Sequence, residues 1–400
     1  MARRALHALW LVALLVCQPL VAAQAQNKEA LGAVTGRVLY ADTQQPARLA
    51  HVVLQPVVDL QSPLLKKGDE GYQPEGLFHL QTVNLDGSFS ILAVPPGLYY
   101  VIAEQDGYIS PLALFTRDQL NHPDDALLHR IARYMTPISV TAGHTTQTEV
   151  DLIRGAVIAG TVRFEDGSPA VNVAVNLIQL DAKGEWKAVR TQHLASHNSS
   201  YTDDQGAYRF SGLPAGEYLV RASIELNKVI LDHIFSSNGS TSYGDGYHLR
   251  IYPGDTFRPR DTMPVKVEEG ENVTSLDVDV PLSKLYSLSG VVMRPDSASP
   301  ANAAHLTLSF ADTGEELVST DVDADDGSFR FDFVPGGNYI LRATKIATVA
   351  RTEVPTCNGC IPPTHTEMKI INRFGDVSVP VQLTGDQSSV LLQATLATKP

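Results

Sequence analysis

The sequence predicts an all-β protein of three tandem β-sandwich domains with one short helix. A segment of alternating residues and tight turns occurs three times without gaps, turn signals recur about every 8 to 12 residues, and few stretches have a helical period. The predicted organisation is a signal peptide at 1–25 followed by domains at 32–153, 154–283 and 284–400.

The repeated segment reads DGSFSILAVPPGLYYVIA at 86–103, QGAYRFSGLPAGEYLVRA at 205–222 and DGSFRFDFVPGGNYILRA at 326–343. Its first Gly accepts the positive φ of a tight turn, and its Pro-x-Gly element reverses the chain between two alternating strands. Gln205 stands in the second copy where the other two copies have Asp. This replacement indicates that the position has a role in the turn and is not a catalytic acid shared by the copies. The Tyr two residues after each reversal predicts a tyrosine corner, with the ring inside and the hydroxyl on nearby backbone; these are Tyr99, Tyr218 and Tyr339.

A second matched segment precedes each copy and begins at Gly36, Gly160 or Gly290, which are 124 and 130 residues apart. Each contains two short alternating runs separated by a polar turn that closes with Pro. Because solenoid repeats are much shorter than this spacing, the repeat predicts three tandem domains.

The stretch HPDDALLHRIARYM at 122–135 is the exception to the strand pattern. A Pro and two acids suit the start of a helix, and Leu127, Leu128, Ile131 and Met135 share one predicted face. We expect a short helix packed on the first domain or at its boundary.

Gly-x-Val, a Gly/Pro turn, Asp-Gly-x-Phe-x-Phe and Leu-Pro-x-Gly-x-Tyr-x-Val-x-Ala together resemble the carboxypeptidase regulatory-like domain. That family is grouped with transthyretin-like and starch-binding-like sandwiches, so the resemblance implies a Greek-key, prealbumin-like fold in all three copies. In the first copy it extends to Gly107 and Tyr108, and in the second to YPGD at 252–255. The matching residues set turns and core, and such a fold hosts many functions.

The N-terminus MARRALHALWLVALLVCQPLVAAQAQ predicts a secretory signal peptide cleaved after Ala25. Acylation at Cys17, as in a lipoprotein, and a retained membrane anchor are the alternatives. Removing two arginines and no acids takes the formal net charge from -13 to -15. An acidic surface argues against nucleic acid as a partner, and no later apolar run of about 18 residues predicts a membrane span after cleavage.

Signatures of catalysis do not occur in the sequence. None of the 12 histidines starts a His-x-x-Glu pair, and no Gly-x-Ser-x-Gly elbow, phosphate-binding Gly-rich loop or dinucleotide fingerprint is present. We therefore expect no enzyme activity and no cofactor. The acidic run at 321–327 has alternating carboxylates, but Asp326 and Asp332 occupy the positions where an EF-hand loop needs Gly and a bidentate acid, so a solvated turn is favoured over calcium binding.

Cys357 and Cys360 bracket an Asn-Gly turn, and in an exported protein a local disulfide is the favoured interpretation. The following Pro-Pro opposes the helix of a thioredoxin-like redox site. Zinc binding with His365, which lacks an evident fourth ligand, and free thiols remain alternatives.

The stretch SYGDGYHLRIYPGDTF at 242–257 is rich in aromatic residues. Since sugars stack on exposed rings, it is the predicted carbohydrate platform, with Tyr243, Tyr247 and Tyr252 as candidates and Trp186 more distant. The alternative is that Tyr252 and Phe257 cover the open end of the sandwich as core residues.

The resulting expectation is an exported bacterial protein, periplasmic, cell-surface or extracellular, that acts without catalysis as a structural, adhesive or partner-binding module. Its expected partner is an unidentified protein or polysaccharide of the cell envelope. Carbohydrate binding through the aromatic stretch in the second domain is the main alternative.

Overall fold

The computed structural model describes residues 31–57, 78–115, 119, 124–180, 184–189, 201–226, 247–296, 299–323, 325–355 and 364–396. At 78, 79, 351, 353, 355 and 364–368 only the backbone is described. The predicted signal peptide and Cys17 lie outside the described residues, as do Tyr243, Cys357 and Cys360. Within the described ranges, no helix combines the length and apolar composition that crossing a bilayer requires.

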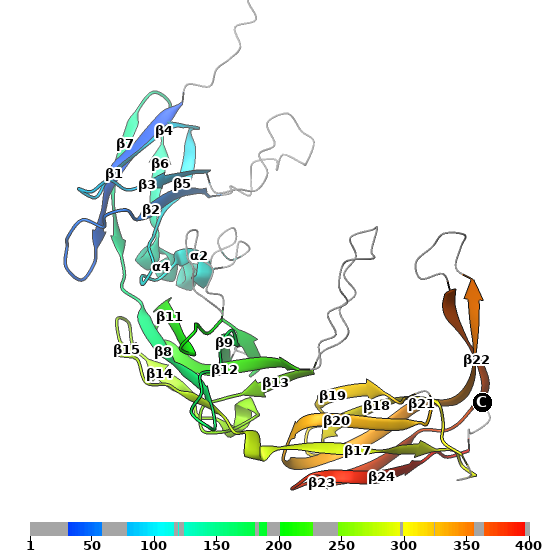
Figure 1. Ribbon diagram of the computed structural model, residues 1–400. Coiled ribbons are helices and arrows are strands. Elements are labelled where there is room, and N and C mark those ends of the chain that lie inside the picture. The colour runs from blue at the N-terminus through cyan, green and yellow to red at the C-terminus, as the bar shows by residue number, and fades with distance from the viewer. Residues whose placement is uncertain are drawn as a thin grey trace, which may run out of the picture. The chain divides into compact units, whose positions relative to one another are not determined.

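The chain divides into two compact units, of which the first contains residues up to Gln105 together with Ser110–Ile153. Its described elements build two sheets, in the orders β4-β1-β7 and β3-β2-β5-β6 (Figure 1). The elements are β1 (Gly32–Tyr40), β2 (His51–Pro56), β3 (Phe78–Thr82), β4 (Ser88–Val94), β5 (Gly97–Glu104), α2 (Pro111–Leu114), α4 (Asp125–Tyr134), β6 (Thr136–Val140) and β7 (Thr145–Leu152).

The second unit contains Asp106–Ile109 and Arg154–Pro400. Its sheets have the orders β11-β8-β15 with β16 on β8, β10-β9-β12-β13 with β14 on β12, β20-β17-β24, and β19-β18-β21-β22 with β23 on β21. The first half is β8 (Ala156–Phe164), β9 (Ala174–Leu180), β10 (Trp186–Ala188), β11 (Ala207–Leu213), β12 (Gly216–Leu226), β13 (Tyr247–Ile251), the 3-10 helix η2 (Pro259–Asp261), β14 (Val265–Val267), β15 (Asn272–Val273) and β16 (Val278–Val280). The second half is the 3-10 helix η3 (Leu282–Lys284), β17 (Leu285–Met293), β18 (Ala303–Phe310), β19 (Glu316–Asp321), β20 (Ser328–Pro335), β21 (Gly337–Pro355), β22 (Thr364–Arg373), β23 (Val377–Leu383) and β24 (Gln387–Gln393).

Facing sheets share an apolar core, which makes the fold an all-β sandwich, as the sequence predicts. One core of the second unit joins Ile158 of β8 to Val220 of β12, and another joins Leu288 of β17 to Leu341 of β21. Alternation along each strand places these side chains on the inner face. Because both cores belong to one compact unit, the count of three domains and their boundaries stay predictions.

The three copies of the repeated segment form equivalent hairpins: β4 with β5, β11 with β12, and β20 with β21. The strand upstream of each hairpin pairs antiparallel with its first strand and parallel with a later one, as β1 does with β4 and β7. The predicted tyrosine corners are confirmed, because each ring is at most 5% exposed and its hydroxyl donates to the carbonyl of the Pro four residues earlier. The O···O distances are 2.9 Å for Tyr99, 2.8 Å for Tyr218 and 2.7 Å for Tyr339.

The turn that opens each hairpin also has the predicted chemistry. Asp86 accepts hydrogen bonds from the amide and hydroxyl of Ser88, and these bonds lower the pKa of its carboxyl. In the second copy the carboxylate of Asp203 accepts the amide of Gln205, so the missing Asp is replaced from two residues upstream. The residue at this position therefore serves the turn.

The Gly that begins each upstream segment lies where a neighbouring strand approaches most closely. A Cβ at Gly290 would lie 1.9 Å from the carbonyl oxygen of Val390 and 2.9 Å from the ring of Phe329. At Gly36 and Gly160 a carbonyl oxygen would lie 2.1 Å away. Any side chain at these positions would collide with that backbone, which belongs to β7 at Gly36, to the segment between β15 and β16 at Gly160 and to β24 at Gly290, so only Gly fits.

The predicted helix at 122–135 is observed as α4, whose N-cap Asp124 accepts the amide of Leu127 at 2.7 Å. Ile131 and Met135 are buried as expected, but Leu128 is 44% exposed. The prediction that Leu128 shares the packed face is therefore wrong, because the ten-residue helix buries only a narrow stripe centred on Ile131.

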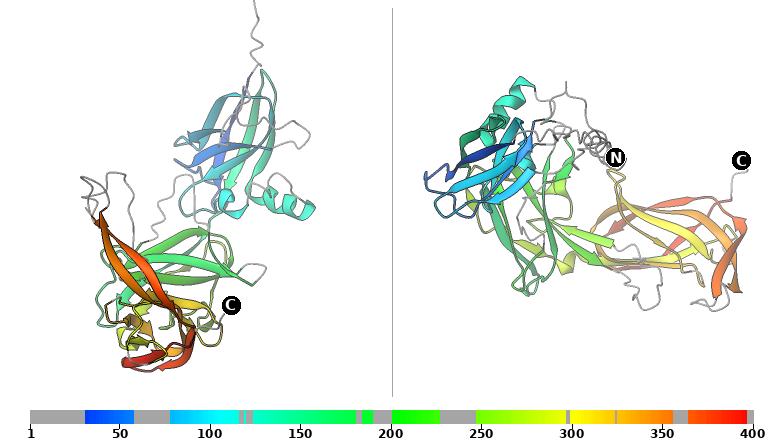
Figure 2. Two further views of the ribbon diagram at one scale, coloured as in Figure 1. Left: turned by 90° about the vertical axis from the view of Figure 1, so that its right-hand side faces the viewer. Right: turned by 90° about the horizontal axis from the view of Figure 1, so that it is seen from above.

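Strands β21 and β22 continue past the rest of their sheet as a two-stranded ribbon (Figure 2). Their pairing runs from Ala347 with Arg373 to Pro355 with Thr364, whereas β18 pairs with β21 only as far as Ala347. The described residues from 347 to 355 and from 364 to 373 thus form this ribbon. The Cys-Asn-Gly-Cys turn lies outside the described residues, so its disulfide stays a prediction.

Candidate functional site

A cleft of about 570 Å³ lies in the second unit, along the outer edges of β13 and β19. Consecutive residues 247–250 line one side and 315–320 line the other. Each of these strands pairs on one side only among the described strands, β13 with β12 and β19 with β18. The cleft is therefore bordered by two sheet edges that no described strand fills.

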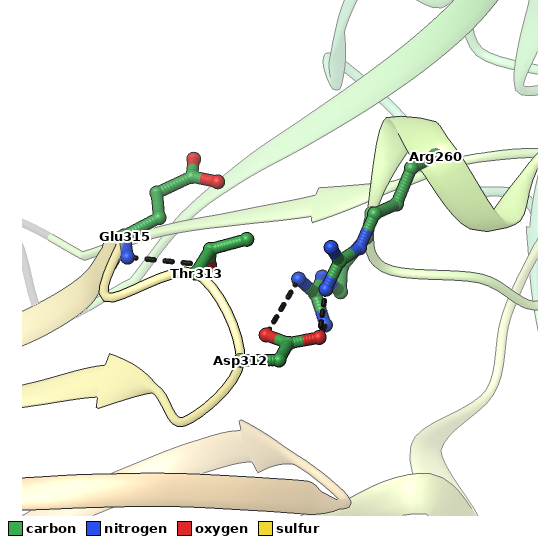
Figure 3. A network of polar contacts seen from close by, with 5 residues as sticks. Arg260, Asp312, Thr313 and Glu315 are labelled. Carbon is green, nitrogen blue, oxygen red and sulfur yellow. Dashed lines mark hydrogen bonds and ion pairs between the residues drawn. The ribbon is translucent and has the colours of Figure 1, made fainter.

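Arg258, which lines the cleft, belongs to a cluster of charges named here the Arg258–Asp312 clamp. Figure 3 shows Arg260 beside the Asp312 carboxylate of this cluster. Arg258 donates two parallel hydrogen bonds to the Asp312 carboxylate at 2.9 and 3.0 Å, and Arg260 approaches the same carboxylate. The two arginines flank Pro259 at the start of η2, whereas Asp312 lies in the turn between β18 and β19. The clamp thus joins segments that contribute to different cores.

The Arg258 guanidinium is also stacked over the ring of Phe310, 4.2 Å from its centroid, and its side chain is only 17% exposed. Bidentate geometry and partial removal from water make such a pair stronger than a typical surface ion pair. Leu317 and Val318 of β19 pack against both cores beside it. This junction is therefore held by apolar contact and by charge-assisted hydrogen bonds together.

A second set of polar contacts joins the same two halves at η3. Glu165, in the turn after β8, accepts the amide and hydroxyl of Ser283 at 2.8 and 2.6 Å, and these bonds lower the pKa of its carboxyl. Lys284 pairs with Asp255 at 3.1 Å. Since β16 ends at Val280 and β17 begins at Leu285, the connection between the two cores is short and hydrogen-bonded.

Most of the charged side chains in the cleft have an ion partner. Arg330 of β20 binds Asp332 with N···O distances of 2.7 to 2.9 Å, and Arg250 lies 3.8 Å from Glu315 across the cleft. Arg221 of β12 is different: no carboxylate of the described residues pairs with it, and its buried Nε has no hydrogen-bond acceptor. Among the described residues, Arg221 and Glu316 are therefore the charged side chains of the cleft that form no ion pair.

Of the four predicted carbohydrate-binding residues, the structure brings Trp186, Tyr247 and Tyr252 to this one cleft, and Tyr243 lies outside the described residues. Tyr247 is 7% and Tyr252 is 2% exposed, so neither offers the open ring face that the prediction required. Alternation along β13 points Tyr247, Leu249 and Ile251 to the core, whereas Tyr252, just after the strand, is buried in a separate cluster with Ile178 and Leu219. Trp186 is partly buried and packs on Tyr252 and its neighbours.

The two buried tyrosines differ in how their hydroxyls are satisfied. The Tyr247 hydroxyl is buried without a hydrogen-bond partner, and burial raises its pKa far above the ordinary value. Burial also raises the pKa of Tyr252, but a hydrogen bond from Arg221 opposes that rise. The Tyr247 hydroxyl and the Arg221 Nε are thus two buried donors without an acceptor among the described residues, and the β12–β13 register places them on opposite faces of the sheet.

The acidic run at 321–327 is a turn in which carboxylates bind the backbone. Asp323 and Asp326 accept the amides of Asp325 and Ser328 at 2.8 and 2.9 Å, and Asp321 contacts the His305 ring at 2.8 Å. Among the described residues, no three His, Cys, Asp or Glu side chains gather closely enough to hold a metal ion. Calcium binding at this run stays an untested hypothesis.

Sequence reasoning missed Arg221, Arg258 and Asp312. The Arg-Pro-Arg run at 258–260 is a local basic cluster in an acidic chain and could have drawn attention to η2. Asp312 gives no such signal, because it lies in an ordinary polar turn.

No family model matches the chain, and no curated protein matches it, so the carboxypeptidase regulatory-like resemblance stays an expectation. Solved structures that are similar include the Bacillus anthracis TIE protein, at 15% identity over 92% of this chain and a TM-score of 0.20; this chain spans only 51% of that protein. A streptococcal ancillary pilin has 12% identity, covers 92% of this chain and 99% of its own, and has a TM-score of 0.29. A putative carbohydrate binding protein from Pseudomonas aeruginosa has 14% identity over 32% of this chain and 92% of its own, with a TM-score of 0.17. At these scores the likenesses support no inference about function.

Proposed function

We propose that this protein is exported and works as a non-catalytic structural, adhesive or partner-binding module at the cell envelope or outside it. The observation that carries the proposal is the junction in the second unit. A bidentate clamp, two apolar side chains of β19 that pack on both cores, and a short hydrogen-bonded connection join two sandwich cores. Relative domain motion is the default between sandwiches joined by a linker, so a junction reinforced in this way suits a protein that transmits force or presents a fixed surface.

Small-angle scattering of the mature chain tests this rigidity. Asp312→Ala removes the clamp and should widen the distribution of interatomic distances. The two cores are then held together only by Leu317 and Val318 of β19 and by the polar contacts at η3. Asp376→Ala is the matched control, since it removes an Asp paired with Arg342 at 2.9 Å inside one sandwich. Equal distributions for the wild type and both variants would contradict a role for the clamp.

The functional part of the proposal is tested with isolated cell envelopes from a strain that lacks the gene. Labelled mature protein should bind them saturably, and unlabelled protein should displace it. Binding that never saturates would contradict a specific module. Release of soluble envelope fragments in proportion to time and protein concentration would show turnover and overturn the non-catalytic assignment.

Carbohydrate binding stays the alternative proposal. It is supported by the meeting of Trp186 with Tyr247 and Tyr252 at one cleft, although only Trp186 is partly exposed. Retention on starch, cellulose or chitin that Trp186→Ala abolishes would favour it, and absence of retention on all three would count against it.

A further inference from the structure

The ribbon of β21 and β22 has an open sheet edge. β18 and β22 lie on opposite sides of β21, and β18 pairs with it only as far as Ala347. Among the described residues, β22 is the one strand that pairs with β21 beyond that point. The ribbon extends past the rest of its sheet (Figure 2), and Thr352 on β21 is exposed. Because an edge strand presents unpaired backbone groups, this edge can pair with another chain.

The open edge is limited at both ends. Asn302 closes its first end, because its side-chain amide donates to the Val349 carbonyl at 3.0 Å and accepts the Val349 N–H at 2.8 Å. The backbone groups of Val349 therefore point to the β18 side, and alternation along the strand points those of Arg351 and Glu353 the same way. Pro355, which ends β21, has no N–H to donate. The groups left for pairing are those of Arg351 and Glu353.

This short edge, with the sequence VARTEVP at 349–355, is complementary to itself. When two copies pair antiparallel about Thr352, Arg351 of each copy lies opposite Glu353 of the other, and each such pair exchanges backbone hydrogen bonds in both directions. Opposite charges at facing positions stabilise a strand pair, whereas like charges destabilise it. Centring the pair on Arg351 or on Glu353 would place like charges opposite each other. The charges therefore favour the register centred on Thr352.

The ends of the edge fit the same two-fold arrangement. In the register centred on Thr352, Val349 of one copy comes opposite Pro355 of the other, so the pairing stops where Asn302 already satisfies Val349 and where β21 ends. Both ends stop for the same reason, as two-fold symmetry requires. A longer strand of another protein would gain no further hydrogen bonds from this edge, which favours a second copy as the partner.

We propose that residues 350–354 of β21 pair antiparallel with the same residues of a second copy, forming a two-fold symmetric dimer. The interface is small, so the dimer is weak, with a dissociation constant between micromolar and millimolar. This self-association goes beyond the structural role proposed above and does not depend on the Arg258–Asp312 clamp.

Cysteine cross-linking of the mature chain tests the register, with Cys357→Ser and Cys360→Ser as the background. Thr352 would face itself at a position without hydrogen bonds, where facing Cα atoms are about 4.5 Å apart and a disulfide can form. Mild oxidation of Thr352→Cys should therefore give a disulfide-linked dimer. Val354→Cys is the matched control, because its two copies would lie about 14 Å apart.

The control should cross-link with itself at least about tenfold more slowly, since a disulfide cannot span that distance. Mixed with Ala350→Cys, which the register places opposite it, Val354→Cys should form a heterodimer. Equal rates for Thr352→Cys and Val354→Cys, or no dimer of Thr352→Cys, would overturn the proposal.

Sedimentation equilibrium up to millimolar concentration tests the dimer without a covalent bond. Arg351→Glu places like charges opposite each other and should weaken dimerisation at least about fivefold, and adding Glu353→Arg should restore the wild-type constant to within about twofold. A wild type that stays monomeric, or a double variant as weak as the single one, would overturn the proposal. Asp312→Ala should leave the dimerisation constant unchanged, which separates this result from the test of the clamp.

Discussion

Two buried tyrosines of the same core allow the energetic value of a tyrosine corner to be measured directly. Tyr218 is 1% exposed and donates to the Pro214 carbonyl at 2.8 Å, whereas Tyr247 is 7% exposed and its hydroxyl has no partner. Replacing either with Phe keeps the ring and removes one oxygen. The two substitutions are therefore matched in burial and differ in one hydrogen bond.

Tyr218→Phe should cost about 1–3 kcal/mol of unfolding free energy, because it removes a hydrogen bond and leaves the Pro214 carbonyl without this donor. Tyr247→Phe should cost nothing or stabilise by up to about 1 kcal/mol, since it removes a buried polar group that is not satisfied.

Thermal unfolding followed by near-ultraviolet circular dichroism measures both effects. For a body of this size 1 kcal/mol corresponds to about 2–4 °C, so Tyr218→Phe should lower the transition by roughly 2–12 °C while Tyr247→Phe leaves it unchanged or raises it. If both variants lost the same stability, the corner hydrogen bond would contribute nothing beyond packing, and the reasoning would be refuted.

Three further predictions concern pH, a close approach and a helix cap. Burial raises the pKa of Tyr218 to about 12. The stability that the protonated hydroxyl contributes should therefore be intact below about pH 10 and decline as the pH rises toward 12. Melting midpoints measured across this range should fall less steeply in Tyr218→Phe than in the wild type. Gly290→Ala places a Cβ 1.9 Å from the Val390 carbonyl and should destabilise by about 3 kcal/mol or more in urea unfolding, whereas Gly385→Ala, with nothing within 4 Å, should change stability by less than about 0.5 kcal/mol. Asp124→Ala should cost about 1 kcal/mol by removing the N-cap of α4, and Asp124→Asn should restore most of it; equal losses for Ala and Asn in thermal unfolding would contradict the capping role.

The local structure was predictable because each element depends on neighbours in sequence. Asp-Gly turns, Pro-x-Gly reversals and tyrosine corners use hydrogen bonds that span two to four residues, and all three copies of the segment form as expected. The helix α4 was predictable for the same reason, since its cap and its apolar spacing are local.

The face that each aromatic residue presents was harder to predict. The carbohydrate candidates Tyr247 and Tyr252 were expected to offer exposed rings, yet β13 points Tyr247 into the core and Tyr252, just after the strand, is buried against Ile178 and Leu219. Leu128 shows the converse error: its spacing fits the apolar face of α4, but the residue is 44% exposed. Burial depends on what packs against a residue, and spacing alone does not contain that information.

The sequence by itself determined the class of the fold, its repeated hairpins and the position of its helix, because turn chemistry and alternation act over a few residues. Only the tertiary structure decided that Arg258 meets Asp312, 54 residues later, and that Trp186 lines the same cleft as Tyr247. Those contacts depend on which sheet edges face each other. That arrangement is set by the packing of whole sandwiches, which no local pattern in the chain records.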